Sequence, residues 1–481
     1  MTTKQRYLST LFISLLCCVI SVVWYFVPHP AIPIVLALIP LGALFVLSQT
    51  FWLVTLFVLF SFFRIHEAIP ALYSLKIPLM LSLGALSALL WHTLVSKQIK
   101  VYWHRSFTWL SIFWVLVIIG ILFASSPGIA IASFKSVYWK IIVMTLAIAW
   151  LVNNNKNIGR IAILITLSGA LIASVAIFNS INGIDLVEGT RVSIGRSIGS
   201  MLGDPNDLSL VLMFPLAFSI ALVTTKGVPF PSRLIALITT CLLMSAIIAT
   251  QSRGGLLGSI AVIGIYALKL IRSKVLLISL GAIAGIILYF VAGISDRSSG
   301  GAAEEGIDES AMGRLYAWEA AFKMALHNPL TGVGIDNFYA NYFFYSPHWD
   351  GLNHAVHSTW FGVLAETGFL GLIVFIGFIT SLILSARNTL AAIAKNPDHY
   401  SANLIVAANA VYAGLIGTIV SGTFLTQGFN WPIYILAALT VAVANITQTQ
   451  INENQVSENT DSESQVPENK ASENPRSNIS N

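Results

Sequence analysis

The chain alternates between long apolar runs and short polar connectors. Runs of about 17 to 25 apolar residues have the length needed to cross a hydrocarbon core of about 30 Å as helices. The runs at 31–47 and 50–64 are short and closely linked, so we predict about 12–14 transmembrane helices. The predicted fold class is all-α, a polytopic membrane helical bundle with one long loop that contains short amphipathic helices. The candidate spans are 8–27, 31–47, 50–64, 76–95, 107–124, 137–152, 160–180, 207–224, 234–250, 254–271, 274–293, 357–386, 402–421 and 431–447.

The composition excludes an ordinary soluble domain. Hydrophobic residues make up 56% of the 481 residues and charged residues 10%, whereas a typical globular domain is about 25% charged. Cys17, Cys18 and Cys241 all lie in apolar runs, which provides neither a disulfide framework nor zinc-ligand spacing and predicts buried thiols. No basic or stacked-aromatic nucleic-acid module is visible, so we expect no nucleic acid as a partner.

The distribution of Lys and Arg predicts the orientation in the membrane. With the N-terminus in the cytoplasm, sixteen of the 26 basic residues lie on the cytoplasmic side, including the short basic connectors at 97–105 and 269–274. Cytoplasmic loops carry an excess of Lys and Arg. We therefore predict that both termini are cytoplasmic, N-in and C-in.

These patterns divide the chain into five parts. Residues 1–180 are predicted to form N-terminal transmembrane helices, and residues 181–293 transmembrane helices joined by outward loops that contain arginine. Residues 294–356 form a long periplasmic loop, and residues 357–447 the C-terminal transmembrane helices. Residues 448–481 consist mainly of Asn, Glu, Ser and Gln, and are predicted to be a disordered cytoplasmic tail because they cannot bury enough apolar surface to fold.

Four arginines and one histidine stand out on the predicted outer face: Arg191, Arg196, Arg253, Arg314 and His357. Arginine donates planar, permanently charged hydrogen bonds that suit phosphate, and neighbouring glycines let the backbone approach a ligand closely. These arginines would suit a lipid diphosphate. The alternative for Arg253 is a side chain that snorkels to the membrane–water interface and binds no ligand. For Arg191 the favoured interpretation is an ordinary loop charge, which is also the alternative for Arg196. The alternative for His357 is an interfacial histidine bonded to a carbonyl.

The acidic residues of the same region have simpler interpretations. Glu366 lies about nine residues inside its helix, roughly 13 Å deep, which is too far for direct chemistry at the surface, so we expect it to pair within the bundle. Six further acidic residues are candidate metal ligands, although solvated loop charge is the favoured interpretation. They are Asp204, Asp207, Glu304, Glu305, Asp308 and Glu309.

One segment of the long loop has helical periodicity. Residues 313–328 place Leu315, Trp318, Phe322 and Ala325 on one apolar face, and the predicted helix ends before Pro329. The following 331–338 contains two glycines and predicts a tight turn, not a phosphate loop, since no Gly-Lys-Ser/Thr follows. We expect the helix to lie in the membrane surface and roof the site.

Several motifs together resemble a known family. His357-Ser358, nine residues, Gly368, two residues and Gly371 resemble the histidine signature of the bacterial O-antigen ligase superfamily, which includes O-antigen polymerases and protein O-oligosaccharyltransferases. The stretches RSIGSMLGDPND (196–207) and QSRGG (251–255) are similar to its two arginine motifs. Residues 313–338 resemble the segment that precedes the histidine. The resemblance covers about residues 190 to 375.

The resemblance implies transfer of a glycan from a polyprenyl-diphosphate carrier to a glycan, lipid or protein acceptor on the periplasmic face of the bacterial inner membrane, with no cofactor and no metal. His357 would be the general base, because histidine titrates in the useful range. Arg196 and Arg253 would bind the diphosphate, with Arg191 and Arg314 behind them. Two departures stand out: the spacing from Arg196 to Pro205 is about one residue long by comparison, and fourteen spans exceed the dozen usual for the ligases.

Three functions are consistent with these residues. The first is a ligase that joins a preassembled glycan to another molecule, and the second is a repeat-unit polymerase or protein O-oligosaccharyltransferase with the same site. The third, a transporter of lipid-linked glycan, would place charges at the membrane midplane within broken helices and show repeated halves. The polar residues cluster on one predicted face, and no repeat is visible, which favours an enzyme.

Overall fold

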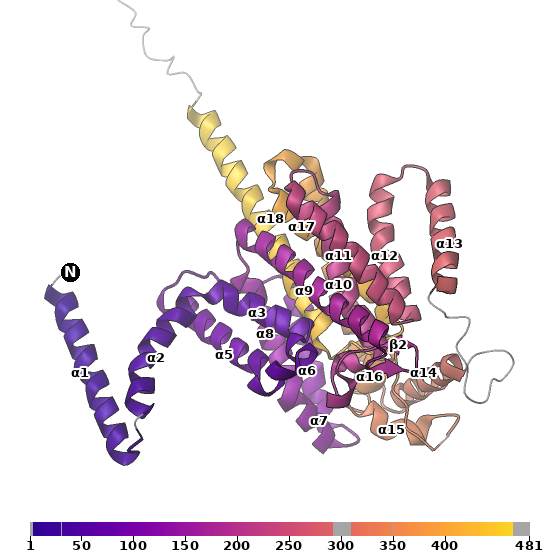
Figure 1. The fold of residues 1–481 in the computed structure, drawn as a ribbon, viewed down its shortest axis with the longest axis horizontal. Helices are drawn as coiled ribbons and strands as arrows, with labels where there is room; N and C mark the ends of the chain where they lie inside the picture. The colour runs from indigo at the N-terminus through magenta and orange to yellow at the C-terminus, as the bar shows by residue number, and fades with distance from the viewer. Residues whose placement is uncertain (1–2, 30, 292–308, 350, 465–481) are drawn as a thin grey trace, which may run out of the picture.

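The computed structural model describes residues 3–29, 31–291, 309–349 and 351–464, and these are almost entirely helical (Figure 1). Eleven helices within the described residues are long and apolar enough to cross a membrane. Three shorter apolar helices account for the difference from the fourteen predicted runs: Ile13–Phe26, Thr50–Phe62 and Lys274–Ile283. Each predicted run is helical in its described part, which confirms a polytopic all-α membrane protein.

The helices follow one another along the chain with short connections. The N-terminal half contains α1 (Thr3–Phe26), α2 (Ala31–Ser48), α3 (Thr50–Phe62), α4 (Ile65–Ala68), α5 (Ile77–Leu90), α6 (Arg105–Leu122), α7 (Pro127–Ser133), α8 (Trp139–Leu151) and α9 (Asn155–Asn182). The C-terminal half contains α10 (Pro205–Thr224), α11 (Phe230–Ala249), α12 (Arg253–Leu270), α13 (Lys274–Val291), α14 (Glu309–His327), α15 (Phe338–Tyr345), α16 (Thr359–Lys395), α17 (Ala402–Gly422) and α18 (Trp431–Ser464).

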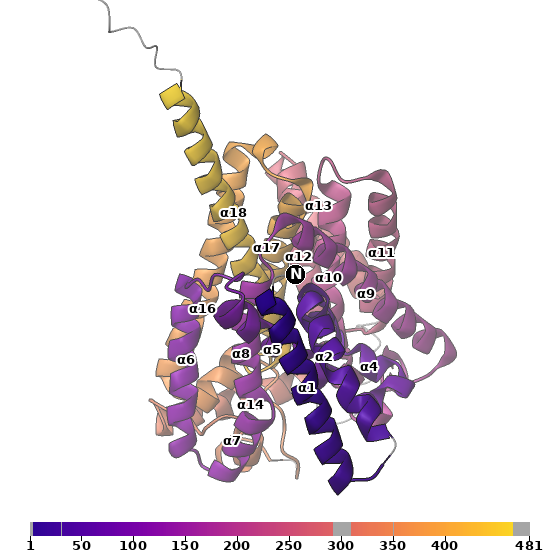
Figure 2. The ribbon, with the colours of Figure 1, turned by 90° about the vertical axis from the view of Figure 1, so that its left-hand side faces the viewer.

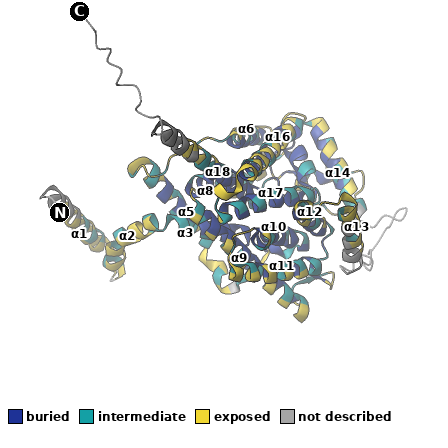
Figure 3. Cartoon of the chain, turned by 90° about the horizontal axis from the view of Figure 1, so that it is seen from above, coloured by how far each residue is buried: buried dark blue, intermediate teal, exposed yellow. Residues whose placement is uncertain are grey.

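The core of the bundle surrounds α10. This helix is apolar on every side, and its neighbours α9, α11, α12 and α17 cover it, as expected for a helix buried all round (Figure 3). By contrast, α1 and α2 project from the bundle, and α2 has no buried residue (Figures 1 and 3). Cys17, Cys18 and Cys241 are exposed, so the prediction of buried thiols was wrong; they lie on outer helix faces, where lipid can solvate them.

Two local predictions also differ from the structure. The loop 181–206 contains a short antiparallel hairpin, in which β1 (Leu186–Val187) pairs with β2 (Arg191–Val192). Helix α18 continues to Ser464, so residues 448–464 are helical although their composition predicts disorder. Extending an existing helix costs far less than nucleating one, and α18 is already nucleated in the bundle. Residues 465–481 lie outside the described part of the chain.

Helix α16 is broken by a glycine. Gly368 has φ 71° and ψ −173°, a conformation that essentially only glycine adopts. The segment after α14 fills the break: Val333 N donates to Ala365 O (2.8 Å), Gly334 N donates to Glu366 O (3.2 Å), and Phe369 N donates to Pro329 O (2.8 Å). The predicted turn is therefore present, and it supplies the hydrogen bonds that the broken helix lacks.

The helix predicted in the long loop is α14, and it ends before Pro329 as expected. Two residues of its predicted apolar face, Leu315 and Phe322, are 46% and 45% exposed and do not pack into the bundle. The buried side chains are small or flexible and let α14 approach its neighbours closely: Ala317, Ala320, Ala321, Met324 and Ala325. The two positions of the predicted face that do pack inward are Ala325 and the partly buried Trp318.

Candidate functional site

The N-terminal ends of α10, α12 and α16 are held together by polar side chains. Ser252 Oγ donates to Asn206 Oδ1 (2.9 Å), which joins α12 to α10. Gln427 Nε2 donates to Asp207 Oδ1 (3.0 Å), and the Gln427 backbone N donates to Thr359 Oγ1 (3.0 Å). The N-terminal end of a helix carries partial positive charge, so three such ends on one face favour an anionic ligand.

Arg191 is a buried link between these ends. Its Nε donates to Thr250 O (3.2 Å) after α11, and its Nη2 donates to Asn206 Oδ1 (3.1 Å) on α10. Only 8% of the residue is exposed. The alternative that Arg191 is an ordinary loop charge is therefore excluded, because its guanidinium is part of the packed structure.

His357 lies immediately before α16 in an unusual backbone conformation. Its φ of 43° falls in the left-handed region, which costs a residue other than glycine about 1–3 kcal/mol and is typical of functional sites. Ser358 caps the helix, since its Oγ accepts a hydrogen bond from Phe361 N (3.4 Å). The imidazole is half-buried at the mouth of α16.

The electrostatics of His357 show which charges surround it. Burial lowers the pKa of its imidazole, and the positive charge of Arg314 lowers this pKa further. Asp204 acts in the opposite direction, while His354 and Arg191 contribute to the lowering. The structure thus brings Arg191, Arg314 and His357 into one electrostatic environment, although they are far apart in the sequence.

Arg314 lies near His357 because contacts of Trp318 hold α14 against the start of α16. Trp318 Nε1 donates to Val356 O (3.1 Å), and the Trp318 ring stacks on Phe361 at 5.1 Å between centroids. Arg314 lies one turn before Trp318, so both project from the same side of α14. The roofing role predicted for this helix remains a prediction, since it depends on where the membrane surface lies.

Arg253 is the first residue of α12 and follows the cap Ser252, whose Oγ accepts from Gly255 N (3.2 Å). Its Nε is buried. The glycines after it serve packing, not approach to a ligand: a Cβ at Gly254 would lie 3.1 Å from Phe424 Cβ, and one at Gly255 would overlap Ser209. Through Ser252 and Asn206, Arg253 belongs to the same polar group as Arg191.

Arg196 has a different environment. It begins a short 3-10 turn, Arg196–Ile198, between Gly195 and Gly199, which both have positive φ. Its side chain is exposed, and among the described residues it forms no hydrogen bond or ion pair. The structure therefore does not join Arg196 to the group around His357 by any described contact.

The acidic candidates have structural partners. Glu366 is buried and accepts a hydrogen bond from Phe338 N (3.4 Å), so its partner is the start of α15 and not another bundle helix. Asp204 caps α10 by accepting from Asn206 N (2.6 Å). Among the described residues no group of three His, Cys, Asp or Glu side chains is arranged to hold a metal. Glu304, Glu305 and Asp308 lie outside the described residues.

Two residues of this site have no clear signal in the sequence. Gln427 is fully buried, bonds Asp207, and has an Oε1 without a hydrogen-bond partner among the described residues. His354 packs its ring against Tyr342 at 5.3 Å between centroids. Gln427 follows α17 in a stretch that also contains Thr423, Thr426 and Asn430, so the sequence does not single it out, and only the fold shows that it meets α10 and α16.

One comparison with known proteins bears on this site. Residues 237–376 match the family model described as O-antigen ligase. The match confirms the expected resemblance to this family over these residues. The O-antigen ligase match runs from within α11 to beyond the helix break in α16 and contains Arg253, Arg314 and His357, whereas Arg191 and Arg196 precede it. No curated protein matches the chain.

If His357 is the base of a transfer reaction, the charges around it predict opposite shifts in the pH profile for two substitutions. A base works when neutral, so activity falls as pH drops through its pKa. Arg314→Gln removes a cation that lowers the His357 pKa, and the acidic limb should move to higher pH. Asp204→Asn removes an anion that raises the His357 pKa, so the acidic limb of the pH profile should move to lower pH. The asparagine can still cap α10. Initial rates between pH 4.5 and 8 would test this, and two unmoved limbs would contradict a role for His357 as the base.

Proposed function

We propose that this protein transfers a glycan from a polyprenyl-diphosphate carrier to an acceptor hydroxyl at the face where α10, α12 and α16 begin. The match to O-antigen ligases supports a membrane protein of the glycan ligase or polymerase type. The observation that carries the proposal is the position of His357, which lies among the charges of Arg314, Arg191 and Asp204.

His357 is proposed as the general base. The acceptor hydroxyl gives its proton to the imidazole as its oxygen attacks the anomeric carbon, and the bond from that carbon to the diphosphate oxygen breaks. The electron pair of this bond leaves with the diphosphate, and attack from the opposite side inverts the anomeric configuration. Burial and the nearby cations keep His357 neutral and able to accept the proton.

The arginines are proposed to stabilise the charge that grows on the leaving diphosphate. Arg253 and Arg314 are the main candidates, because Arg253 starts a helix at the gathered ends and Arg314 acts on His357. Arg191 contributes its charge from a fixed position, since its donors already bond Thr250 and Asn206. Arg196, which is exposed, would contact the more distant part of the donor.

The proposed site of the reaction is the periplasmic face of a bacterial inner membrane. The positive-inside pattern of the sequence supports both termini in the cytoplasm and the His357 face in the periplasm of a bacterial inner membrane. In this arrangement the loop 294–356 is periplasmic. Donor and acceptor would both reach the site from the outer leaflet.

A substitution at Arg253 tests the proposed diphosphate site. Arg253→Ala should lower the rate of donor consumption by about 10²–10³-fold, the typical cost of losing one donor that stabilises transition-state charge. Arg253→Lys should recover only part of this loss, because lysine keeps the charge and loses the planar fork. The control is Arg272→Ala, an exposed arginine between α12 and α13. Rates would be measured in proteoliposomes with a lipid-linked glycan donor, and Arg253→Ala with the wild-type rate would contradict the assignment.

The wild-type product distinguishes the two transferase classes. A ladder of repeat units, resolved by gel and mass, would identify a polymerase, because each product becomes the next acceptor. A single transfer to a different molecule would identify a ligase, and a glycosylated protein would identify an O-oligosaccharyltransferase.

A further inference from the structure

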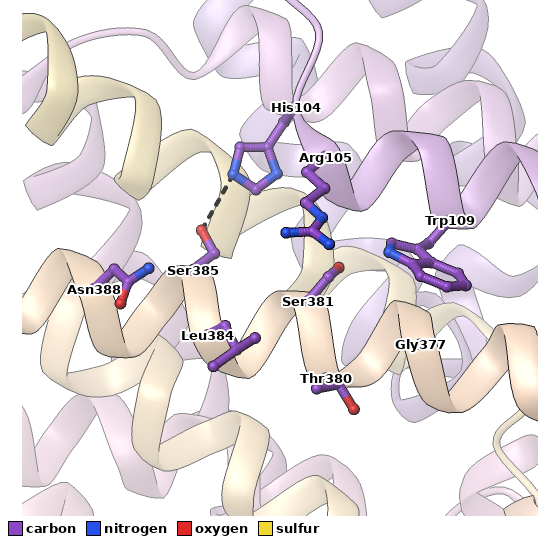
Figure 4. A pocket seen from close by; sticks show the side chains of 9 residues that line it. All are labelled: His104, Arg105, Trp109, Gly377, Thr380, Ser381, Leu384, Ser385 and Asn388. Atoms are coloured by element: carbon purple, nitrogen blue, oxygen red, sulfur yellow. Dashed lines mark hydrogen bonds between the residues drawn. The ribbon is translucent and has the colours of Figure 1, made fainter.

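A cavity lies at the opposite end of the bundle from His357. It has a volume of about 360 Å³ and is formed between the start of α6 and the C-terminal half of α16, which run side by side (Figure 2). Its polar lining comprises His104, Arg105, Ser381, Ser385 and Asn388 (Figure 4). The broken helix α16 thus contributes to both ends of the molecule.

The walls of this cavity are built by close contacts. Trp109 lies across Gly377. A Cβ at position 377 would come within 2.6 Å of the indole ring, so any other residue there would displace the indole. Ser381 Oγ donates to Ser106 Oγ (2.8 Å) and fixes the two helices in register. The cavity therefore has a defined shape set by these contacts.

The lining offers hydrogen-bond donors and one permanent positive charge. His104 Nδ1 accepts from Ser106 N (3.1 Å), which places the imidazole proton on Nε2, near Ser385 Oγ (3.3 Å). The guanidinium of Arg105 points toward the cavity between His104 and Trp109 in Figure 4, and it has no hydrogen-bond or ion-pair partner among the described residues. No carboxylate is among the lining residues, so an anion would meet no repulsion there.

The position of the cavity along the membrane-spanning helices indicates which kind of ligand it binds. Arg105 is the first residue of a span, and Trp103, two residues earlier, is 60% exposed. Tryptophans gather where lipid headgroups meet the hydrocarbon. Leu384 at the rim is 48% exposed, which gives an acyl chain an apolar surface beside the polar pocket.

We propose that this cavity binds the phosphate of an anionic phospholipid headgroup, with Arg105 as its charged donor. Arginine suits phosphate because it donates parallel, charge-assisted hydrogen bonds. Basic pockets between transmembrane helices at this height are suited to anionic headgroups. The site is separate from the transfer chemistry proposed for the opposite face, so it can be tested without a glycan donor.

The test measures lipid retention by the purified full-length protein in detergent. Native mass spectrometry would compare phosphatidylglycerol with phosphatidylcholine on the wild type, Arg105→Gln and the control Arg387→Gln. Arg387 is an exposed arginine near the same end of α16 that does not line the cavity. We expect the wild type to prefer phosphatidylglycerol, Arg105→Gln to weaken its binding about fivefold or more, and Arg387→Gln to leave it unchanged.

A second variant and a soluble competitor complete the test. Asn388→Trp would fill the mouth of the cavity from an exposed position and should also weaken phosphatidylglycerol binding. Inorganic phosphate at millimolar concentration should not displace the lipid; if it does, the site takes a soluble phosphate and the lipid assignment is overturned. Equal retention of phosphatidylglycerol by the wild type, Arg105→Gln and Asn388→Trp would overturn the proposal entirely.

Discussion

Replacing His357 with alanine is expected to lower the rate of glycan transfer by about 10²–10⁴-fold, the range in which a positioned general base contributes. The loss should appear in the rate at saturating donor, because the imidazole removes a proton in the transition state and does not hold the carrier. Initial rates of donor consumption in proteoliposomes measure this directly.

His354 provides a matched control for this substitution. It lies three residues before His357 and contributes to the same electrostatic environment, but its ring packs against Tyr342. His354→Ala should therefore reduce the rate by less than about tenfold, well below the loss of a general base. If His354→Ala abolished transfer and His357→Ala did not, the roles assigned here would be reversed.

The second large effect is expected at Gly368. Alanine there would need a backbone conformation that essentially only glycine adopts, and its Cβ would lie 2.5 Å from Pro329 O and 2.8 Å from Pro329 C. Both neighbours are backbone atoms that cannot rotate away. We expect Gly368→Ala to destabilise the fold by on the order of 3 kcal/mol and to release the segment that closes the break in α16. Thermal unfolding of the detergent-solubilised protein would show a lower midpoint.

Gly313→Ala is the control for this prediction. Gly313 lies in α14 with nothing within 4 Å of an added Cβ, so alanine should be neutral or stabilise the helix by up to about 1 kcal/mol. Equal unfolding midpoints for Gly368→Ala and the wild type would contradict the requirement for glycine at the break in α16.

Much of this fold was predictable because membrane helices are encoded locally. Each apolar run became a helix, since a hydrocarbon core leaves no other way to satisfy the backbone of a single segment. The end of α18 was not predictable from composition, because its polar residues extend a helix that is already nucleated by its packing in the bundle. The sequence also did not indicate which residues α14 buries in the bundle, since close packing selected small alanines over larger apolar side chains.

The site was predictable to a similar degree. The motif around His357 predicted a catalytic role that stays a prediction, and the family match confirmed the resemblance over residues 237–376. The preference for Arg196 over Arg191 rested on the resemblance of residues 196–207 to an arginine motif. The structure instead buries Arg191 against Thr250 and Asn206, which depends on a hairpin and on tertiary contacts that no local pattern encodes.

The most direct test of the central proposal is to count products in proteoliposomes that contain only the wild-type protein, a lipid-linked glycan donor and an acceptor. If the face around His357 is a transfer centre, free polyprenyl diphosphate should appear in equal molar amount to glycosidic bonds formed, and His357→Ala should stop both. Movement of intact donor across the membrane without release of diphosphate would contradict the proposal and identify a transporter.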